Sequence, residues 1–108
     1  MTTPDDILEM LRDDMVSHGF FLQSIADGDG NCTPESRETA LLAELLSSGK
    51  VEIGAAKLAG PDYVEFVAWA GTIEDRIRRA IQAVSNAVGP DKEFAYWLCL
   101  RENVDRYE

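Results

Sequence analysis

Hydrophobic side chains recur along this chain with two different periods. In three segments they fall three or four positions apart, which places them on one face of a helix. In four shorter segments they alternate with polar residues, or form an apolar run bounded by Gly, Pro or Asp, which is typical of strands. The pattern predicts helices over residues 4–17, 34–48 and 73–88, and strands over residues 20–26, 50–59, 62–70 and 93–101.

The predicted helices carry start and stop signals. Thr3 and Thr33 each precede a proline, so a capping hydroxyl stands before a residue suited to the first helical position. Thr72 opens the third helix in the segment TIED, an incomplete capping box. Gly19 and Gly49 are placed to end the first and second helices.

The order of elements predicts one α+β domain over residues 1–108. After the first helix the order is β-α-β-β-α-β, which is the ferredoxin-like sandwich. In that topology residues 62–70 form an interior strand and residues 93–101 an edge strand. The apolar run YWLCL in the edge strand then needs a cover, either the first helix or the same strand of a second copy in a homodimer.

Two alternatives stay open at this level. Residues 20–26, FFLQSIA, can instead continue the first helix beyond a kink at Gly19. The whole chain can also form a winged helix, with residues 34–49 as the recognition helix and residues 51–70 as the wing.

The charge is strongly negative and uneven. The chain of 108 residues has a formal net charge of −10, and residues 1–48 hold ten acidic and two basic side chains. An acidic surface repels phosphate backbones, which disfavours nucleic-acid binding, and it suits a protein partner with a basic surface. It also serves solubility alone. The residues predicted to bind a partner are Asp5, Asp6, Glu9, Asp13, Asp14, Tyr96, Trp97 and Leu98.

The sequence favours a cytoplasmic protein without a cofactor. It contains no apolar run of the ~20 residues that a membrane span needs, and its N-terminus is acidic where a signal peptide is basic. Two cysteines and one histidine cannot form the ligand set of a structural zinc site. Reduced thiols are the expected state of both cysteines.

One stretch, DGDGNCTPESRE at residues 27–38, resembles an EF-hand calcium loop in its ligand spacing. The calcium ligands in this interpretation are Asp27, Asp29, Asn31 and Glu38. Cys32 stands where the loop needs glycine for its sharp turn, and Pro34 has no N–H to donate. These two departures favour a turn that leads into a capped helix, so no metal is expected.

His18 is the only histidine, and on a continuous helix it would lie one turn from Asp14. A His–carboxylate pair can act as a general base, but no suitably placed nucleophile accompanies it. The sequence therefore predicts a non-catalytic protein-interaction or regulatory module. The alternative is a small ligand-binding domain or enzyme with a pocket near His18.

Overall fold

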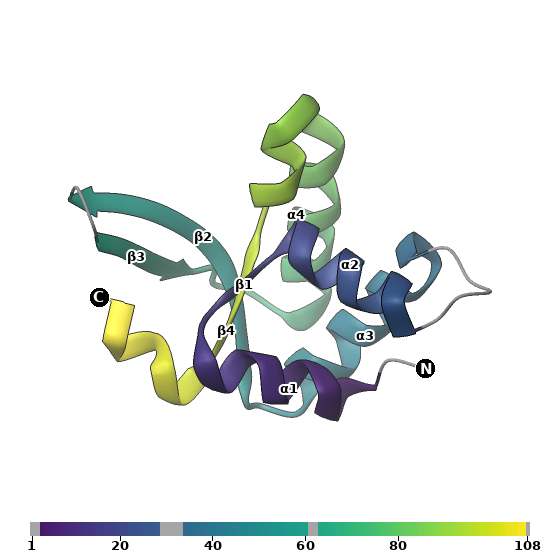
Figure 1. Ribbon diagram of the computed structural model, residues 1–108, viewed down its shortest axis with the longest axis horizontal. Helices are drawn as coiled ribbons and strands as arrows, with labels where there is room; N and C mark the ends of the chain where they lie inside the picture. Colours follow the sequence, from purple (N-terminus) through teal and green to yellow (C-terminus); the bar gives the residue numbers. More distant parts are fainter. Residues whose placement is uncertain (1–2, 29–33, 61–62, 108) are drawn as a thin grey trace.

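The computed structural model describes residues 3–28, 34–60 and 63–107 (Figure 1). These residues form four α-helices, two 3₁₀-helices and a four-stranded antiparallel sheet. The elements in chain order are α1 (Pro4–Asp13), β1 (Val16–Ser17), α2 (His18–Gly28), α3 (Pro34–Ser47), β2 (Val51–Gly60), β3 (Tyr63–Ala68), α4 (Ile73–Asn86), η1 (Gly89–Phe94), β4 (Trp97–Leu100) and η2 (Arg101–Tyr107).

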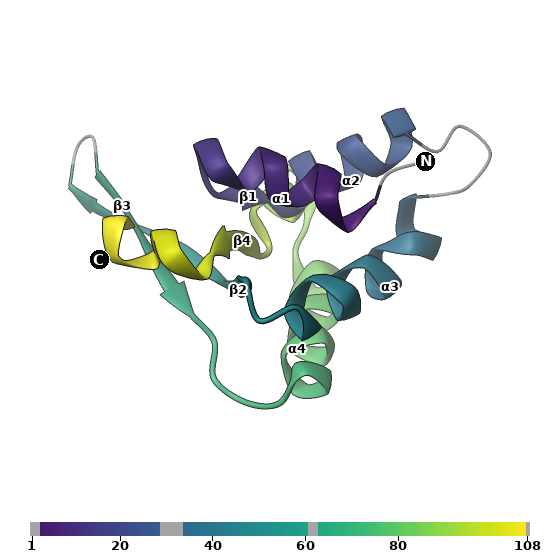
Figure 2. The ribbon, with the colours of Figure 1, turned by 90° about the horizontal axis from the view of Figure 1, so that it is seen from below.

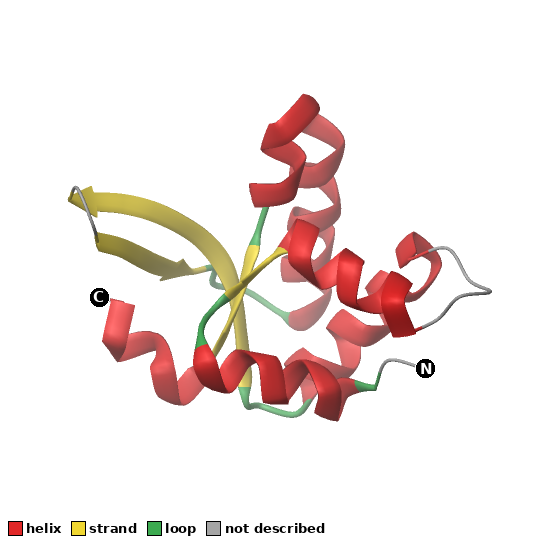
Figure 3. Cartoon of the chain, viewed as in Figure 1, coloured by secondary structure: helices red, strands yellow, loops and turns green. Residues whose placement is uncertain are grey.

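The sheet has the strand order β1-β4-β2-β3. Leu98 in the middle of β4 pairs with Val16 on one side and with Ile53 on the other. β2 and β3 form a hairpin that reaches away from the helices α2 and α3 in both ribbon views (Figures 1 and 2). In the secondary-structure cartoon the short strands β1 and β4 overlap β2 near the centre of the view; β4 lies beside β2 as its antiparallel partner, and β1 lies beside β4 (Figure 3).

The ferredoxin-like arrangement is not confirmed, because its strand order differs from the one observed. The predicted roles of two strands are reversed: β4 is interior, and β3 is an edge strand. The two-residue strand β1 covers the side of β4 that was expected to be open. β4 therefore has no open side that a second copy of the chain would need to cover.

The first helix ends earlier than predicted, and the predicted strand 20–26 is a helix. Asp14 adopts an extended conformation after α1, and the chain runs through β1 before α2 starts at His18. Phe21 and Ile25, four positions apart, both face the core. Residues 20–26 are therefore helical, as the alternative held, but α2 is a separate helix and not a continuation of the first helix beyond a kink at Gly19.

The remaining elements agree with the sequence patterns more closely. Helices α3 and α4 and the hairpin β2–β3 lie where they were predicted, and Gly49 ends α3 with a positive φ of 75°. Thr33, the predicted cap of α3, lies outside the described residues. The last strand is shorter than predicted because η1 extends to Phe94, and the predicted frayed tail forms η2.

Apolar side chains from the helices and from the centre of the sheet form the core. Its fully buried members include Ile7, Leu11, Phe21, Ile25, Leu41, Leu42, Leu45, Ile53 and Leu98. Helix α3 contributes four buried leucines from two successive turns, and these residues form its predicted apolar stripe. No helix in the described part of the chain is long and apolar enough to cross a membrane.

The cap of α4 gives a first testable prediction. Thr72 Oγ1 accepts a hydrogen bond from the N–H of Asp75 at 3.0 Å. Replacing Thr72 with alanine leaves that donor without its protein acceptor, so we expect a loss of about 1 kcal/mol in the free energy of unfolding in urea. Thr39→Ala, at an exposed position inside α3, is the matched control and should be neutral or slightly stabilising. Equal losses in both variants would contradict the capping role.

Candidate functional site

An apolar groove of about 440 Å³ opens where the end of α1, strand β1 and the start of α2 meet β4. It is lined by Met10, Asp13, Asp14, Met15, Phe20 and Trp97, together with Val16 and Ser17 of β1. We call this surface the apolar groove.

The local conformation explains how the groove arises. The N–H of Met15 donates to Asp14 Oδ1 at 2.8 Å, which stabilises the extended link after α1. Ser17 Oγ then accepts from the N–H of Phe20 at 3.4 Å as the chain turns into α2. In this helix Phe21 points into the core, whereas its neighbour Phe20 is exposed.

Large aromatic surface is exposed at the groove. Phe20 is 64% exposed, and the neighbouring Phe94 is 56% exposed. The Phe94 ring stacks on Trp97, with ring centroids 5.8 Å apart and an interplanar angle of 17°. Contiguous apolar surface of this kind marks an interaction site more often than a scattered exposed side chain does. Met10 and Met15 add flexible, polarisable side chains that adapt to a bound surface.

Two carboxylates border this apolar surface. Asp13 and Asp14 are exposed at the C-terminal end of α1 and line the groove. A cationic side chain that reaches the groove therefore meets negative charge next to aromatic rings, and both attract it.

The eight residues predicted to bind a partner separate into three groups. Asp13, Asp14 and Trp97 come together in the groove. Asp5, Asp6 and Glu9 are exposed farther along α1, where Thr3 hydrogen bonds lower the pKa of Asp6 and Arg12 pairs with Glu9 at 3.2 Å. Tyr96 and Leu98 are fully buried, so a partner cannot reach them in the folded protein.

Sequence reasoning missed Met10, Met15 and Phe20. A weak signal for Phe20 was present in the doublet Phe20–Phe21, because adjacent residues of a helix point in different directions and one of the two can be exposed. That signal was lost when the segment was interpreted as a strand buried on both faces.

A second hollow, of about 390 Å³, lies between α2, α3, α4 and η1. We call it the His18 cavity, and its lining includes His18, Leu22, Ala26, Glu38, Val84 and Glu93. His18 and Glu38 are the buried polar residues of the described core, with 3% and 4% of their surface exposed. The predicted neighbour of His18, Asp14, lies before the helix break, so the two residues do not share a helix.

The buried polar groups of this cavity contact one oxygen atom. The Tyr96 hydroxyl donates to Glu38 Oε1 at 2.6 Å, and His18 Nδ1 lies 3.0 Å from the same oxygen. The approach of Nδ1 lacks the direction of a hydrogen bond, so this atom is close to the carboxylate without donating to it. The pKa of Tyr96 is raised strongly, first by burial and then by the adjacent Glu38 carboxylate.

Glu38 is not placed as the calcium ligand that the EF-hand interpretation requires. This residue faces the interior and accepts from Tyr96. Asp29 and Asn31 lie outside the described residues, and Asp27 is in the last turn of α2. Among the residues that the structure describes, no cluster of three His, Cys, Asp or Glu residues could hold a metal ion.

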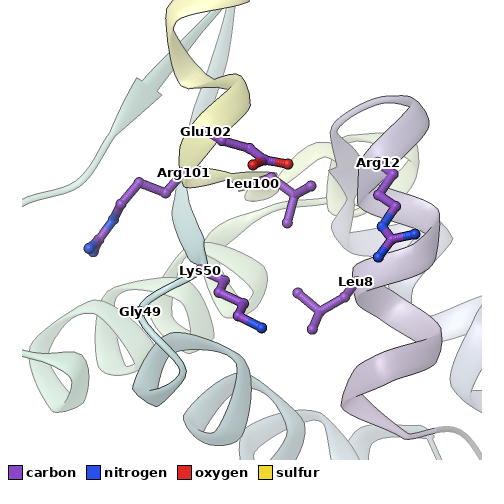
Figure 4. A pocket seen from close by; sticks show the side chains of 7 residues that line it. All are labelled: Leu8, Arg12, Gly49, Lys50, Leu100, Arg101 and Glu102. Atoms are coloured by element: carbon purple, nitrogen blue, oxygen red, sulfur yellow. The ribbon is translucent and has the colours of Figure 1, made fainter.

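A third hollow, of about 470 Å³, has a basic lining (Figure 4). Lys50 and Arg12 lie on either side of Leu8, whereas Arg101 points away from both. Arg101 binds Glu52 at 2.7 Å and Arg12 pairs with Glu9, so two of the three cations are already compensated. The lining of this hollow therefore indicates a class of ligand less clearly than the lining of the other two does.

Comparison of the chain with protein-family models, with curated proteins and with solved structures gave no match. The functional argument accordingly depends on the geometry and chemistry of the described residues.

Proposed function

We propose that this chain is a non-catalytic protein-interaction module, and that its apolar groove binds a basic amphipathic helix of a partner protein. The observation that carries the proposal is the contiguous surface of Phe20, Trp97 and methionine side chains bordered by Asp13 and Asp14. A helix with apolar anchors on one face and Lys or Arg beside them complements both features.

The strand edge beside the groove supports a helical occupant rather than an added strand. β1 is the edge strand here and contains only Val16 and Ser17. Two residues offer too few main-chain hydrogen bonds to hold an extended peptide by strand addition. Affinity would then come from side-chain burial, for which exposed aromatic residues are the usual anchors.

The net charge of −10 supports a basic partner. Long-range attraction accelerates the encounter of oppositely charged proteins and weakens as salt screens it. Asp5, Asp6 and Glu9 extend the negative field from the groove along the exposed face of α1. Their contribution would appear in the association rate rather than in contacts with the partner.

The order α1-β1-α2-α3-β2-β3 also resembles the winged-helix alternative, with α3 as the recognition helix and the β2–β3 hairpin as the wing. We infer that such an arrangement would serve protein binding in this chain. Residues 34–48 contain three glutamates and a single Arg37, which is unsuited to a phosphate backbone. The chain also inserts β4 between β1 and β2.

A peptide titration tests the proposal. The probe is an amphipathic helical peptide of about 18 residues built from Leu and Lys, and its charge control has Glu in place of every Lys. We expect saturable micromolar binding of the Lys peptide, followed by isothermal calorimetry, and weaker binding as salt is added. The Glu peptide should not bind.

Variants of exposed residues locate the binding surface. Phe20→Ala should weaken binding of the Lys peptide about tenfold or more, because Phe20 is the most exposed aromatic anchor of the groove. Val88→Ala is the matched control, since Val88 is 79% exposed and lies outside the groove. Unchanged binding by Phe20→Ala, or equal binding of the Glu peptide, would refute the proposal.

A further inference from the structure

The His18 cavity contains a carboxylate that the fold buries. Glu38 extends from α3 and keeps 4% of its surface exposed. Burying a carboxylate is costly unless hydrogen bonds compensate it. Oε1 accepts from the Tyr96 hydroxyl and lies 3.0 Å from His18 Nδ1, and the carboxylate lines the cavity.

The neighbouring groups hold this carboxylate in a defined place. The N–H of His18 donates to the carbonyl oxygen of Tyr96 at 2.9 Å, which ties the start of α2 to the chain just before β4. The His18 and Tyr96 rings then lie 4.9 Å apart and flank Glu38 Oε1. Fixed neighbours of this kind pre-organise a binding group and reduce the cost of ordering it when a ligand arrives.

The imidazole of His18 has a buried nitrogen atom without a hydrogen-bond partner. His18 Nδ1 is buried and makes no hydrogen bond, despite its distance of 3.0 Å from Glu38 Oε1. Leaving a buried polar atom unpaired destabilises the folded state, and such atoms are rare in folded proteins. A purely structural role would be served better by apolar side chains of similar size.

The rest of the cavity defines the kind of ligand. Leu22, Ala26 and Val84 provide an apolar wall. Lys92 and Glu93 add exposed charges to the lining. With Glu38, the cavity is therefore lined by two carboxylates and one ammonium group. The cavity volume of about 390 Å³ suits a compact molecule.

We propose that the His18 cavity binds a compact organic cation, a primary amine on an apolar body, whose ammonium group donates to Glu38. An ammonium carries three donors and no acceptor, which complements a buried carboxylate that lines the cavity. The apolar body then contacts the wall formed by Leu22 and Val84. This site uses no residue of the apolar groove, so the two proposals are independent.

Benzylamine, benzyl alcohol and benzoate are matched probes that differ in charge and keep the ring. His18 is the only histidine, so the C2–H proton of its imidazole gives a single NMR signal that can be followed during each titration. We expect benzylamine to shift this signal saturably in the millimolar range, and the alcohol and benzoate to leave it in place at the same concentrations. Equal shifts with benzoate, or no saturable shift with benzylamine, would overturn the proposal.

Substitutions separate binding from folding. Glu38→Gln should lower the affinity for benzylamine at least tenfold, whereas Glu44→Gln, on an exposed position of the same helix, should leave it unchanged. Val84→Phe narrows the cavity without touching Glu38 and should also abolish binding, which keeps the test valid if Glu38→Gln does not fold. Wild-type affinity in a folded Glu38→Gln or Val84→Phe protein would refute the site.

Discussion

Replacing Gly54 with alanine should destabilise the folded protein by about 3 kcal/mol or more. Gly54 lies in β2, paired with Ala68 of β3 on one side and with Trp97 of β4 on the other. A Cβ atom there would overlap the carbonyl oxygen of Val67 and would stand 2.9 Å from Cα of Ala68. Both contacts are with backbone, so no side-chain rotation relieves them and the hairpin must shift. Urea unfolding followed by tryptophan fluorescence measures the loss.

Gly19→Ala is the matched control for this prediction. Its added Cβ would lie 2.8 Å from Cγ and 2.9 Å from Cβ of Glu93, and 3.1 Å from the Cα of that residue, so η1 must shift slightly, although the overlap is smaller than at Gly54. Alanine is also the better helix former by up to about 1 kcal/mol, which offsets part of the crowding in α2. We expect a loss of about 1–2 kcal/mol, smaller than the loss in Gly54→Ala. If both variants lose the same stability, the close approach of β2 and β3 is not what makes Gly54 necessary.

Local signals were sufficient for the elements whose ends and faces are set by neighbouring residues. Thr72 and Gly49 each act within one turn, by capping a helix or by adopting a positive φ. The hairpin β2–β3 joins strands that are adjacent in the sequence, so alternation in each strand was enough to find it. The class of the fold follows from these elements.

The strand order could not be obtained in this way. β1 has two residues, which is too short for any period to appear. Its pairing with β4 joins Val16 to Leu98, far apart in the sequence, and nothing in either segment specifies that partner. The apolar run in β4 was consistent with burial on both sides, and the interior position of β4 is the physical reason for it.

Candidate sites were predicted only where one segment supplied them. Asp13 and Asp14 were selected for charge and Trp97 for its apolar surroundings, and the fold brings these two segments together. The contact between Tyr96 and Glu38 spans 58 positions, and Glu38 had been considered only as a ligand of its own loop. His18 was assigned to the wrong helix, so its carboxylate neighbour was also misidentified.

Tyr96→Phe should cost about 2 kcal/mol in the free energy of unfolding at neutral pH. The substitution keeps the ring and removes the hydroxyl that donates to Glu38 Oε1 at 2.6 Å. Hydrogen bonds to charged groups contribute about 1.5–3 kcal/mol, and the buried carboxylate would lose its donor. This loss should depend on pH, because the tyrosine can ionise and phenylalanine cannot.

The sign of that dependence follows from the raised pKa of Tyr96. In the unfolded chain the hydroxyl loses its proton at about pH 10, whereas in the folded protein burial and Glu38 keep it protonated above that value. The folded state then binds more protons than the unfolded state. Above about pH 10 the wild type should therefore lose about 1.4 kcal/mol of stability per pH unit through this group.

The difference between wild type and Tyr96→Phe should accordingly shrink above pH 10 and approach zero near about pH 11.5. Urea unfolding at closely spaced pH values between neutrality and that limit measures both curves. Ile53→Val is the control, since it removes one methyl group from a fully buried residue and should cost about 1 kcal/mol at every pH. If the deficit of Tyr96→Phe is as constant as that of Ile53→Val, then Tyr96 ionises equally readily in both states, and the buried hydroxyl–carboxylate contact does not exist in solution.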